Sequence, residues 1–248
     1  MRLALVTICW NAAKTLRRTV ESIKNQTRLP DEYAFVDGGS TDGTLELLEE
    51  LCRELEERNV KAHVIKQQRQ EGEAGIPSAW NQGIAQVKGD VIGLLNSDDW
   101  YEPDALRTVE KAFAADDGVG MVSIAVRFIS PETGETKRLF RSMPGWQLPF
   151  RMTVPHPGLF VSRRVYDAIG LYDTKYRISA DYDFIWRCRK KGIRMARLDD
   201  ALVNMELGGT ANQNRPLARK ETLDIACRYC RFPVLPWLAW LGRTMTGR

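Results

Sequence analysis

The sequence predicts an α/β fold in which helices flank a mainly parallel central sheet. In the first 115 residues, short apolar runs typical of strands alternate with amphipathic helical stretches, which is the pattern of βαβ units. The run at 91–95 is apolar on both faces, as expected for a strand buried in a parallel sheet. Of the 248 residues, 44% are hydrophobic and 27% are charged, which is sufficient for a full globular core.

Each element of the first half follows from its own pattern. Helices are expected where apolar residues recur every three or four positions, as Leu48, Leu51 and Leu55 do. Asp42 is a candidate N-cap for that helix. The expected order is strand 3–9, helix 14–25, strand 33–36, helix 44–58, strand 62–65, a helix opened by Pro77, strand 91–95 and helix 102–115.

The second half is less regular. Two strands, 119–129 and 136–141, flank a turn that begins at Pro131 and ends at Gly134. We further expect strands at 158–162 and 194–198, and helices at 181–191 and 215–231. The sequence contains no internal repeat and no low-complexity linker. We therefore expect one domain over 1–212, followed by a basic C-terminal helix and an amphipathic tail over 213–248.

The net charge and the cysteines restrict the class of protein. A net charge of +4 with a pI near 8.8 is too small an excess to indicate nucleic-acid binding, but it is compatible with anionic substrates or a membrane surface. Five scattered cysteines argue against a disulfide framework and for a reducing compartment. Cys227 and Cys230 are expected to be small apolar residues on neighbouring helical turns. With no signal peptide expected at the start, the protein is expected to be cytoplasmic.

Polar residues follow the first two expected strands. Trp10 and Asn11 come after the first, and Trp10 is either a base-stacking aromatic or a core residue. The second is followed by a glycine-containing segment from Asp37 to Asp42, where two glycines allow close backbone approach and the next helix offers unpaired N–H groups. An ordinary strand-to-helix loop with an Asp cap is the alternative.

Two acidic sites are candidates for chemistry. Asp98 and Asp99 follow a buried strand, and ligands bind beyond the carboxyl ends of such strands. Adjacent carboxylates repel unless a cation or donor neutralises them, and a divalent cation completed by substrate phosphates fits; a simple turn is the alternative. Asp181 and Asp183 open a helix behind Ser179, which is ordinary capping chemistry. The same position keeps a carboxylate ionised, as a general base requires.

Taken together and in order, these segments resemble family 2 glycosyltransferases with the GT-A fold, closest to the bacterial branch that builds capsule, exopolysaccharide or lipopolysaccharide. The resemblance covers roughly residues 3–210. The segments are Val6-Thr-Ile-Cys-Trp-Asn11, Val36-Asp-Gly-Gly-Ser-Thr-Asp-Gly43, Ala79-Trp-Asn-Gln-Gly-Ile84, Leu95-Asn-Ser-Asp-Asp99 and Ala180-Asp-Tyr-Asp183.

The resemblance implies a nucleotide-diphosphate-sugar donor, an inverting transfer and a role for each matching residue. Asp99 would bind Mg²⁺ or Mn²⁺, and Asp98 would support the nucleotide sugar or the groups around the metal. Asp181 aligns with the catalytic base. Asn81 would lie near the diphosphate and orient the acidic pair. The remaining expected donor contacts, around the nucleobase and ribose, are Thr7, Trp10, Asn11 and Asp37.

Two further segments fall near the acceptor side in relatives. His156 either binds acceptor or phosphate, or is a structural loop histidine. Gly208-Gly-Thr210 resembles a loop that closes near the active site, with a plain turn as the alternative.

Three other functions are alternatives to this interpretation. The usual Asp-x-Asp motif is replaced here by Asn96-Ser-Asp-Asp99, which leaves open a catalytically inactive nucleotide-sugar-binding relative. A nucleic-acid-binding protein is disfavoured by the modest charge. A nucleotidyltransferase would carry a glycine-rich, basic phosphate loop near the first strand, and the segment at Trp10 lacks one.

The C-terminal tail, 228–248, combines tryptophans and leucines with flanking arginines. This composition suits a segment lying on an anionic membrane, as a lipid-linked or glycan acceptor would favour. A helix packed on the domain or into a homodimer is the other interpretation. The longest apolar stretch, 232–242, is interrupted by Pro236 and is about half of the ~20 residues that a spanning helix needs. We therefore expect at most peripheral attachment, to the inner face of the plasma membrane.

Overall fold

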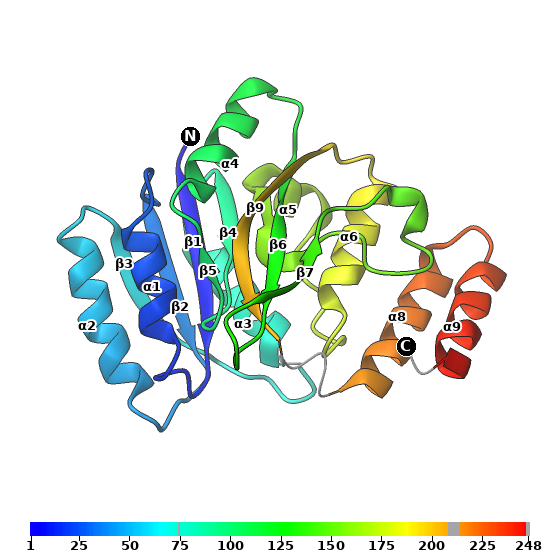
Figure 1. Cartoon of the computed structure of the whole chain (residues 1–248), viewed down its shortest axis with the longest axis horizontal. Helices are drawn as coiled ribbons and strands as arrows, with labels where there is room; N and C mark the ends of the chain where they lie inside the picture. Colours follow the sequence, from blue (N-terminus) through cyan, green and yellow to red (C-terminus); the bar gives the residue numbers. More distant parts are fainter. Residues whose placement is uncertain (74, 208–213, 247–248) are drawn as a thin grey trace.

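A computed structural model describes residues 1–73, 75–207 and 214–246. The first half alternates strands and helices as expected (Figure 1). Its elements are β1 (Leu3–Cys9), α1 (Leu16–Lys24), β2 (Glu32–Asp37), α2 (Thr44–Glu56), β3 (Lys61–Lys66), α3 (Gly75–Gln86) and β4 (Val91–Leu94).

The second half contains the elements that the pattern predicted and some that it did not. The short strand β5 and the helix α5 were not predicted from the sequence. The elements are β5 (Trp100–Tyr101), α4 (Ala105–Ala115), β6 (Met121–Ile129), β7 (Thr136–Phe140), β8 (Leu159–Ser162), α5 (Arg163–Ile169), α6 (Ala180–Lys190), β9 (Met195–Glu206), α8 (Arg215–Tyr229) and α9 (Val234–Thr246).

The strands form one sheet with the order β3-β2-β1-β4-β8-β6-β9-β5, and β7 pairs with β6. From β3 to β4 all pairs are parallel, as expected. Beyond β4 the sheet is mixed, because β8 runs antiparallel to both β4 and β6, whereas β9 runs parallel to β6. Consequently β1, β2, β3, β4, β6 and β9 all end at the same edge of the sheet, and β8 begins there. We call this the carboxyl edge; it lies at the bottom of Figure 1.

Alternate residues of each strand enter two hydrophobic layers, as the pleat of a strand dictates. Leu3 and Leu5 of β1 pack with α1, α2 and α4, whereas Ala4 and Val6 pack with α3, α5 and α6. The second contact is close, since a Cβ on Gly83 of α3 would lie 2.3 Å from Val6 Cγ1. Glycine therefore lets α3 approach the sheet and brings its polar residues near the carboxyl edge.

The strand expected at 194–198 is longer in the structure, because β9 continues to Glu206. Its register against β6 shifts after Ile124, whose partner is Leu198, while the partner of Ala125 is Ala201. Asp199 and Asp200 occupy this irregularity. They interrupt the apolar pattern, which is why the sequence predicted an early end.

The C-terminal helices α8 and α9 form a hairpin at one side of the molecule, where α8 packs on α6 and α9 packs on α8 (Figure 1). Among the described residues, no helix has the length and apolar character needed to cross a bilayer. The domain boundary expected at 212 and the segment Gly208-Gly-Thr210 lie outside the described residues.

Candidate active site

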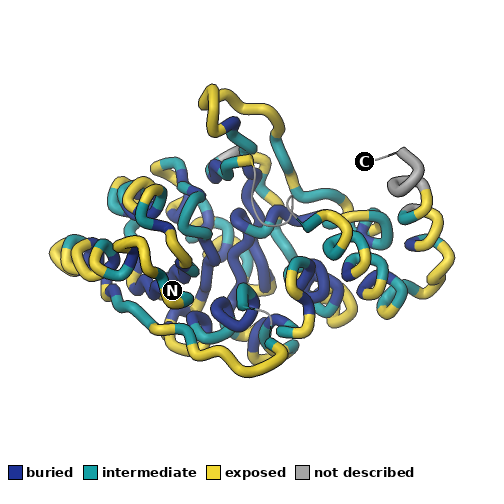
Figure 2. Tube along the Cα trace, turned by 90° about the horizontal axis from the view of Figure 1, so that it is seen from below, coloured by how far each residue is buried: buried dark blue, intermediate teal, exposed yellow. Residues whose placement is uncertain are grey.

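The carboxyl edge brings together segments that are far apart in the sequence, and Figure 2 views the molecule from that side. The loops after β1, β2 and β4 lie there because these strands are parallel neighbours. His156 lies there because β8, which begins at Leu159, is antiparallel to β4. The loops that carry Trp10, Asp37 and Asp99 therefore lie with His156 at a single edge, where open α/β sheets bind ligands.

The loops after β1 and β2 are joined by hydrogen bonds centred on Asp37. Its carboxylate accepts the backbone N–H groups of Gly39 and Ser40 at 2.9 and 3.1 Å, and the Ser40 hydroxyl at 2.6 Å. Asn11 adopts a positive φ of 52° and accepts the N–H of Thr41 through its side-chain oxygen. The β1 and β2 loops are thereby held as one polar surface.

Asp42 supports the same surface. It accepts the N–H of Ala13 at 3.1 Å and that of Thr44 at 3.1 Å, so its carboxylate links the start of α2 to the loop after β1. Asp42 was expected to be the N-cap of α2, but the residue at the cap position is Gly43, and Asp42 lies one residue before it. Hydrogen bonding to Thr44 lowers the pKa of Asp42.

Trp10 and Thr7 differ in accessibility. Trp10 is 68% exposed beside the Asp37 loop, so its ring is open for stacking. Thr7 is fully buried, and its hydroxyl hydrogen-bonds with that of Tyr33 at 2.8 Å. The side chain of Thr7 is thus used inside the core, and the expected donor contact through this side chain is not available in the structure.

The Asp99 side chain is almost completely buried. It is 1% exposed; Oδ2 accepts the Asn96 amide at 2.9 Å, while Oδ1 is buried without a partner among the described residues. Burial, and then the neighbouring charge of Asp98, raise the pKa of Asp99 well above its ordinary value. Asp98 is less buried, and its pKa is also raised, mainly by burial.

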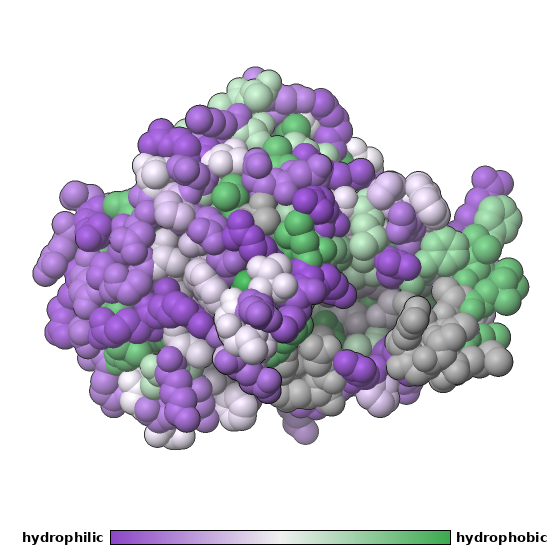
Figure 3. Space-filling model, viewed as in Figure 1, coloured by the Kyte–Doolittle hydropathy of each residue, from purple (hydrophilic) through white to green (hydrophobic). Residues whose placement is uncertain are grey.

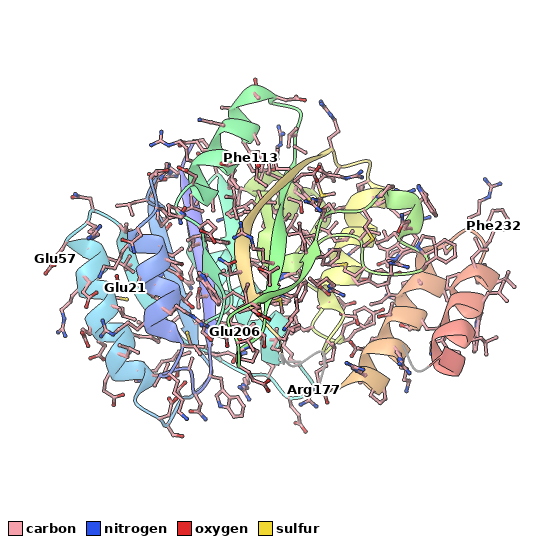
Figure 4. The ribbon with its side chains drawn as sticks, in the orientation of Figure 1. Glu21, Glu57, Phe113, Arg177, Glu206 and Phe232 are labelled. Atoms are coloured by element: carbon pink, nitrogen blue, oxygen red, sulfur yellow. The ribbon has the colours of Figure 1, made fainter. Side chains whose placement is uncertain are left out.

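Arg18 braces the loop that carries these acids. Its guanidinium donates to the backbone carbonyl of Asp98 at 2.9 Å, pairs with Glu206 at the end of β9, and lies 4.0 Å from the centre of the Trp100 ring. Glu206 lies at the lower end of the sheet (Figure 4). The brace joins α1, the acidic loop and β9, so the acids are held between both halves of the sheet.

The acidic loop fits a divalent cation that is shared with a ligand. Within the described ranges, no three acidic, histidine or cysteine side chains are placed to hold a metal by themselves. Asp99 nevertheless offers a buried carboxylate oxygen that lacks a partner there. Mg²⁺ is commonly bound by one or two carboxylates with phosphates and water supplying the rest. The fit therefore requires a phosphate-bearing ligand.

His156 is enclosed by aromatic residues of the second layer. Its ring stacks on Trp80 with the centroids 4.3 Å apart, and Nε2 lies 3.4 Å from the Tyr172 hydroxyl. Burial lowers the pKa of His156 to about 4, so the ring is neutral at physiological pH. This geometry supports a structural role in the layer, and it also places a neutral imidazole at the carboxyl edge.

Asn81 has a different partner from the one expected. Its amide donates to the backbone carbonyl of Tyr172 at 2.8 Å, and its oxygen accepts the N–H of the same residue at 2.9 Å. The orientation of Asp99 instead comes from Asn96. Asn81 thus anchors the loop before α6 rather than orienting the acidic pair.

Asp181 lies in the first turn of α6, next to that loop. Its carboxylate accepts the N–H of Tyr182 at 2.7 Å. Burial raises the pKa of Asp181 to about 6, against the lowering effect of this bond, and the charge of Glu221 raises it further. A carboxyl with a pKa near neutrality is suited to accept a proton. Asp181 also raises the pKa of Tyr172, which places it beside the His156 cluster.

The second acid of this motif has a structural role. Asp183 is 1% exposed, pairs with Arg187 at 2.7 Å and accepts the Tyr229 hydroxyl at 3.0 Å.

A hydrogen bond also connects the acidic loop to the segment before β8. The Tyr101 hydroxyl, just after that loop, donates to the carbonyl of Pro157, beside His156.

Sequence reasoning missed three charged residues at this edge. Arg69, after β3, donates to the carbonyl of Gly38 at 3.3 Å, beside Asp37. Arg18 braces the acidic loop, and Glu221 binds the segment before α6. The position of Arg69 directly after a parallel strand was a usable signal. No local pattern marked the other two, because both lie on helices whose sites are defined by distant strands or loops.

Comparisons with known proteins identify the family and the fold. The sequence profile of "Glycosyl transferase family 2" matches residues 4–173. A "PGL/p-HBAD biosynthesis glycosyltransferase" of Mycobacterium bovis is 30% identical over 207 residues, covering 82% of this chain and 76% of the relative. The chondroitin synthase of Pasteurella multocida is 29% identical over 217 residues, which span 84% of this chain and 21% of that protein.

Solved structures show the same fold. S. aureus TarS 1-349 in complex with UDP-GlcNAc superposes with a TM-score of 0.70 at 14% identity, covering 97% of this chain and 70% of that one. The mannosyltransferase PcManGT from Pyrobaculum calidifontis, in complex with GDP-Man and Mn²⁺, also gives 0.70, at 18% identity over 98% and 69% of the two chains. The chain belongs to glycosyl transferase family 2 and is a glycosyltransferase with the GT-A fold.

Proposed function

We propose that this glycosyltransferase moves a sugar from a nucleotide-diphosphate donor to a hydroxyl acceptor with inversion at the anomeric carbon. One observation carries the proposal: Asp181, a half-buried carboxyl with a pKa of about 6, opens α6 at the same sheet edge as the Asp37 loop and the Asp98–Asp99 pair. The chain retains both Asp99 and Asp181, which favours an active transferase over an inactive binding relative.

The donor is proposed to bind along the loops after β1, β2 and β4. Trp10 offers an exposed ring to the nucleobase, while Asn11 and Asp37 shape the polar surface beside it. Asp98 lies next to the diphosphate. The structures with UDP-GlcNAc and with GDP-Man and Mn²⁺ share this fold and support the class of donor.

Asp99 is proposed to hold Mg²⁺ or Mn²⁺ together with the donor diphosphate. Such a cation stabilises the negative charge that develops on the leaving oxygens. The protein contributes the buried Oδ1 of Asp99, the Asn96 amide that orients the carboxylate, and the Arg18 brace behind Asp98.

Asp181 is proposed to act as the general base. It takes the proton from the acceptor hydroxyl as that oxygen bonds to the anomeric carbon. The bond to the diphosphate oxygen breaks with its electron pair leaving on the nucleoside diphosphate. Since attack comes from the face opposite the leaving group, the configuration inverts. His156, neutral and beside Tyr172, is proposed to line the acceptor side.

The acceptor is proposed to be lipid-linked or a glycan, in the synthesis of a surface polysaccharide, as the names of the relatives suggest. The α9 helix supports a membrane location. Its exposed apolar side chains gather at one side of the molecule in Figure 3, and Phe232 projects there in Figure 4. Arg228 and Arg231 flank them, so we propose peripheral binding to an anionic membrane on the cytoplasmic side. The exposed residues are Phe232, Val234, Trp237, Leu238 and Leu241.

A thermal-shift panel of nucleotide-diphosphate sugars, each with and without Mn²⁺, tests the donor. A bound donor stabilises the folded state by mass action, so one sugar nucleotide should raise the melting temperature, and more so with Mn²⁺. Release of nucleoside diphosphate from that donor, with water as acceptor, then tests turnover. The absence of any shift across the panel would contradict the proposal.

Vesicle flotation tests the membrane. The full chain should bind vesicles that contain phosphatidylglycerol and should bind phosphatidylcholine vesicles weakly. A double substitution, Trp237→Glu with Leu238→Glu, should abolish binding, and so should truncation after Arg231. The matched control is Trp146→Glu, because Trp146 lies outside α9 and is at least as exposed, at 65% against 49% for Trp237. Unchanged flotation of the α9 variants would contradict the assignment, and concentration-dependent dimers lost in those variants would favour a homodimer interface.

A further inference from the structure

One carboxylate of the C-terminal segment binds the backbone just before Asp181. Glu221 of α8 accepts the N–H of Arg177 at 2.8 Å, of Ile178 at 2.9 Å and of Ser179 at 2.8 Å. Glu221 is 8% exposed, and Ser179 is the N-cap residue of α6. Ser179 makes no side-chain cap of its own. A side chain from another helix thus binds three consecutive N–H groups ahead of the turn that carries Asp181.

Further contacts from α8 hold the same segment. The Tyr176 hydroxyl donates to Asp224 at 3.1 Å, and the hydroxyls of Ser179 and Thr222 lie 3.3 Å apart. Figure 4 shows Arg177 at the lower end of the molecule, between α6 and the start of α8. The approach to α6 is therefore fixed mainly by α8.

We propose that Glu221 is a positioning residue for Asp181, so that α8 forms part of the catalytic apparatus. This inference rests on the proposed role of Asp181 as base. The match to the family profile ends at residue 173, ahead of Asp181. The match therefore does not indicate which residues hold Asp181 in position. The geometry assigns that support to Glu221.

Glu221 acts on Asp181 through position and through charge. The three backbone N–H donors fix the orientation of the Glu221 carboxylate. The negative charge then disfavours ionisation of the nearby Asp181 and adds to the effect of burial on its pKa. Other groups face Asp181 as well: Tyr172 comes from the preceding loop, with His156 behind it, and Asp183 on α6 is already paired with Arg187. Glu221 is the acid whose charge raises the pKa of Asp181.

The test uses the full chain, with turnover measured as nucleoside diphosphate release from the donor selected by the panel. Glu221→Gln keeps the size but removes the charge, and one of its terminal atoms no longer accepts N–H groups. We expect kcat to fall about 10- to 100-fold, because small misplacements of a reacting group have effects of this size. The donor KM should stay near the wild-type value. The acidic limb of the pH profile should move to lower pH, since the ionised form of Asp181 is no longer opposed by a neighbouring charge.

Two variants separate position from charge. Glu221→Asp keeps the charge and shortens the side chain, so kcat should fall while the acidic limb stays close to its wild-type pH. Asp224→Asn is the matched control on the same helix. It weakens the bond to Tyr176, and its pH profile should match the wild type even if its melting temperature falls. All variants are assayed below their melting temperatures, so loss of fold is measured separately.

A wild-type kcat and an unmoved acidic limb in Glu221→Gln would overturn the inference. The same holds if Asp224→Asn moves the limb equally, because the effect would then be a general loosening of α8. Failure of the underlying function looks different: Asp181→Asn itself would keep its turnover. If Asp181→Asn is inactive and Glu221→Gln is normal, only the positioning role is wrong.

Discussion

The two sides of the carboxyl edge are held together in different ways. On the donor side, the main carboxylates bind partners close in sequence: Asp37 binds Gly39 and Ser40, and Asp99 binds Asn96. On the base side the partners are distant. Asn81 binds Tyr172, 91 positions away, and Glu221 binds a segment more than 40 positions before it. The Asp37 and Asp99 carboxylates are thus oriented within their own loops, which longer-range bonds from Asn11 and Arg18 then join, whereas on the base side the orienting bonds themselves come from tertiary packing.

This contrast predicts separable defects. Changes on the donor side should weaken donor binding and affect the loops themselves, whereas changes on the base side should lower turnover with donor binding intact. A parallel loss of both properties from changes on either side would show that the edge behaves as one unit.

The largest effect is expected from Asp181→Asn. Removing a positioned base should lower transfer by about 10²- to 10⁴-fold, while the donor dissociation constant stays near wild type. In the wild type, activity should rise with pH through about 6, because the base must be ionised. The residual activity of Asp181→Asn should not show this rise with pH. Steady-state kinetics from pH 4.5 to 8.5, with calorimetric donor titration, measure both properties.

Asp99→Asn should have the next largest effect and should act on the donor side. Losing the metal carboxylate should lower transfer by about 100-fold, corresponding to about 3 kcal/mol of transition-state stabilisation. The additional thermal shift that Mn²⁺ gives with donor should disappear. Without metal, the variant should be at least as stable as the wild type, because it no longer buries a carboxylate charge beside Asp98. A retained Mn²⁺ shift would place the metal elsewhere.

Asp37→Asn tests whether the local loop shapes the donor surface. The amide cannot accept from all of Gly39 N, Ser40 N and the Ser40 hydroxyl, so unfolding free energy should fall by about 1–2 kcal/mol. The donor dissociation constant should rise, while kcat at saturating donor changes little. The matched control is Asp116→Asn, because Asp116 also accepts a backbone N–H within its own loop, that of Gly118, but lies before β6 at the opposite edge of the sheet; it should cost stability with little effect on the donor. Equal donor defects in both variants would contradict a specific role for Asp37.

The same contrast explains what sequence reasoning could and could not reach. The strands up to β4, their helices and the acidic loop carry local patterns, so their places were predicted closely. The resemblance of the segment from Val6 to Asn11 implies a donor contact for Thr7, but the strand pleat turns this side chain into the core toward Tyr33. Asn81 was assigned to the acids because it matches a motif, while its partner is decided by how α3 meets the loop before α6. Glu221 has no local signal, since its role exists only after α8 docks on α6.

The smallest effect is expected from His156→Phe, which sharpens the assignment of the base. An acidic limb near pH 6 is ordinarily read as a histidine, but burial holds the pKa of His156 at about 4. Phe preserves the stack on Trp80, so the acidic limb of the pH profile should remain at the same pH. Only kinetic parameters that depend on the acceptor, such as the acceptor KM, should change. Because a folded-state pKa below the ordinary value makes stability fall as pH drops from about 6.5 toward 4, the variant should lose less stability over that range than the wild type. Disappearance of the limb in His156→Phe, measured beside Asp181→Asn, would move the proton acceptor from α6 to the loop before β8.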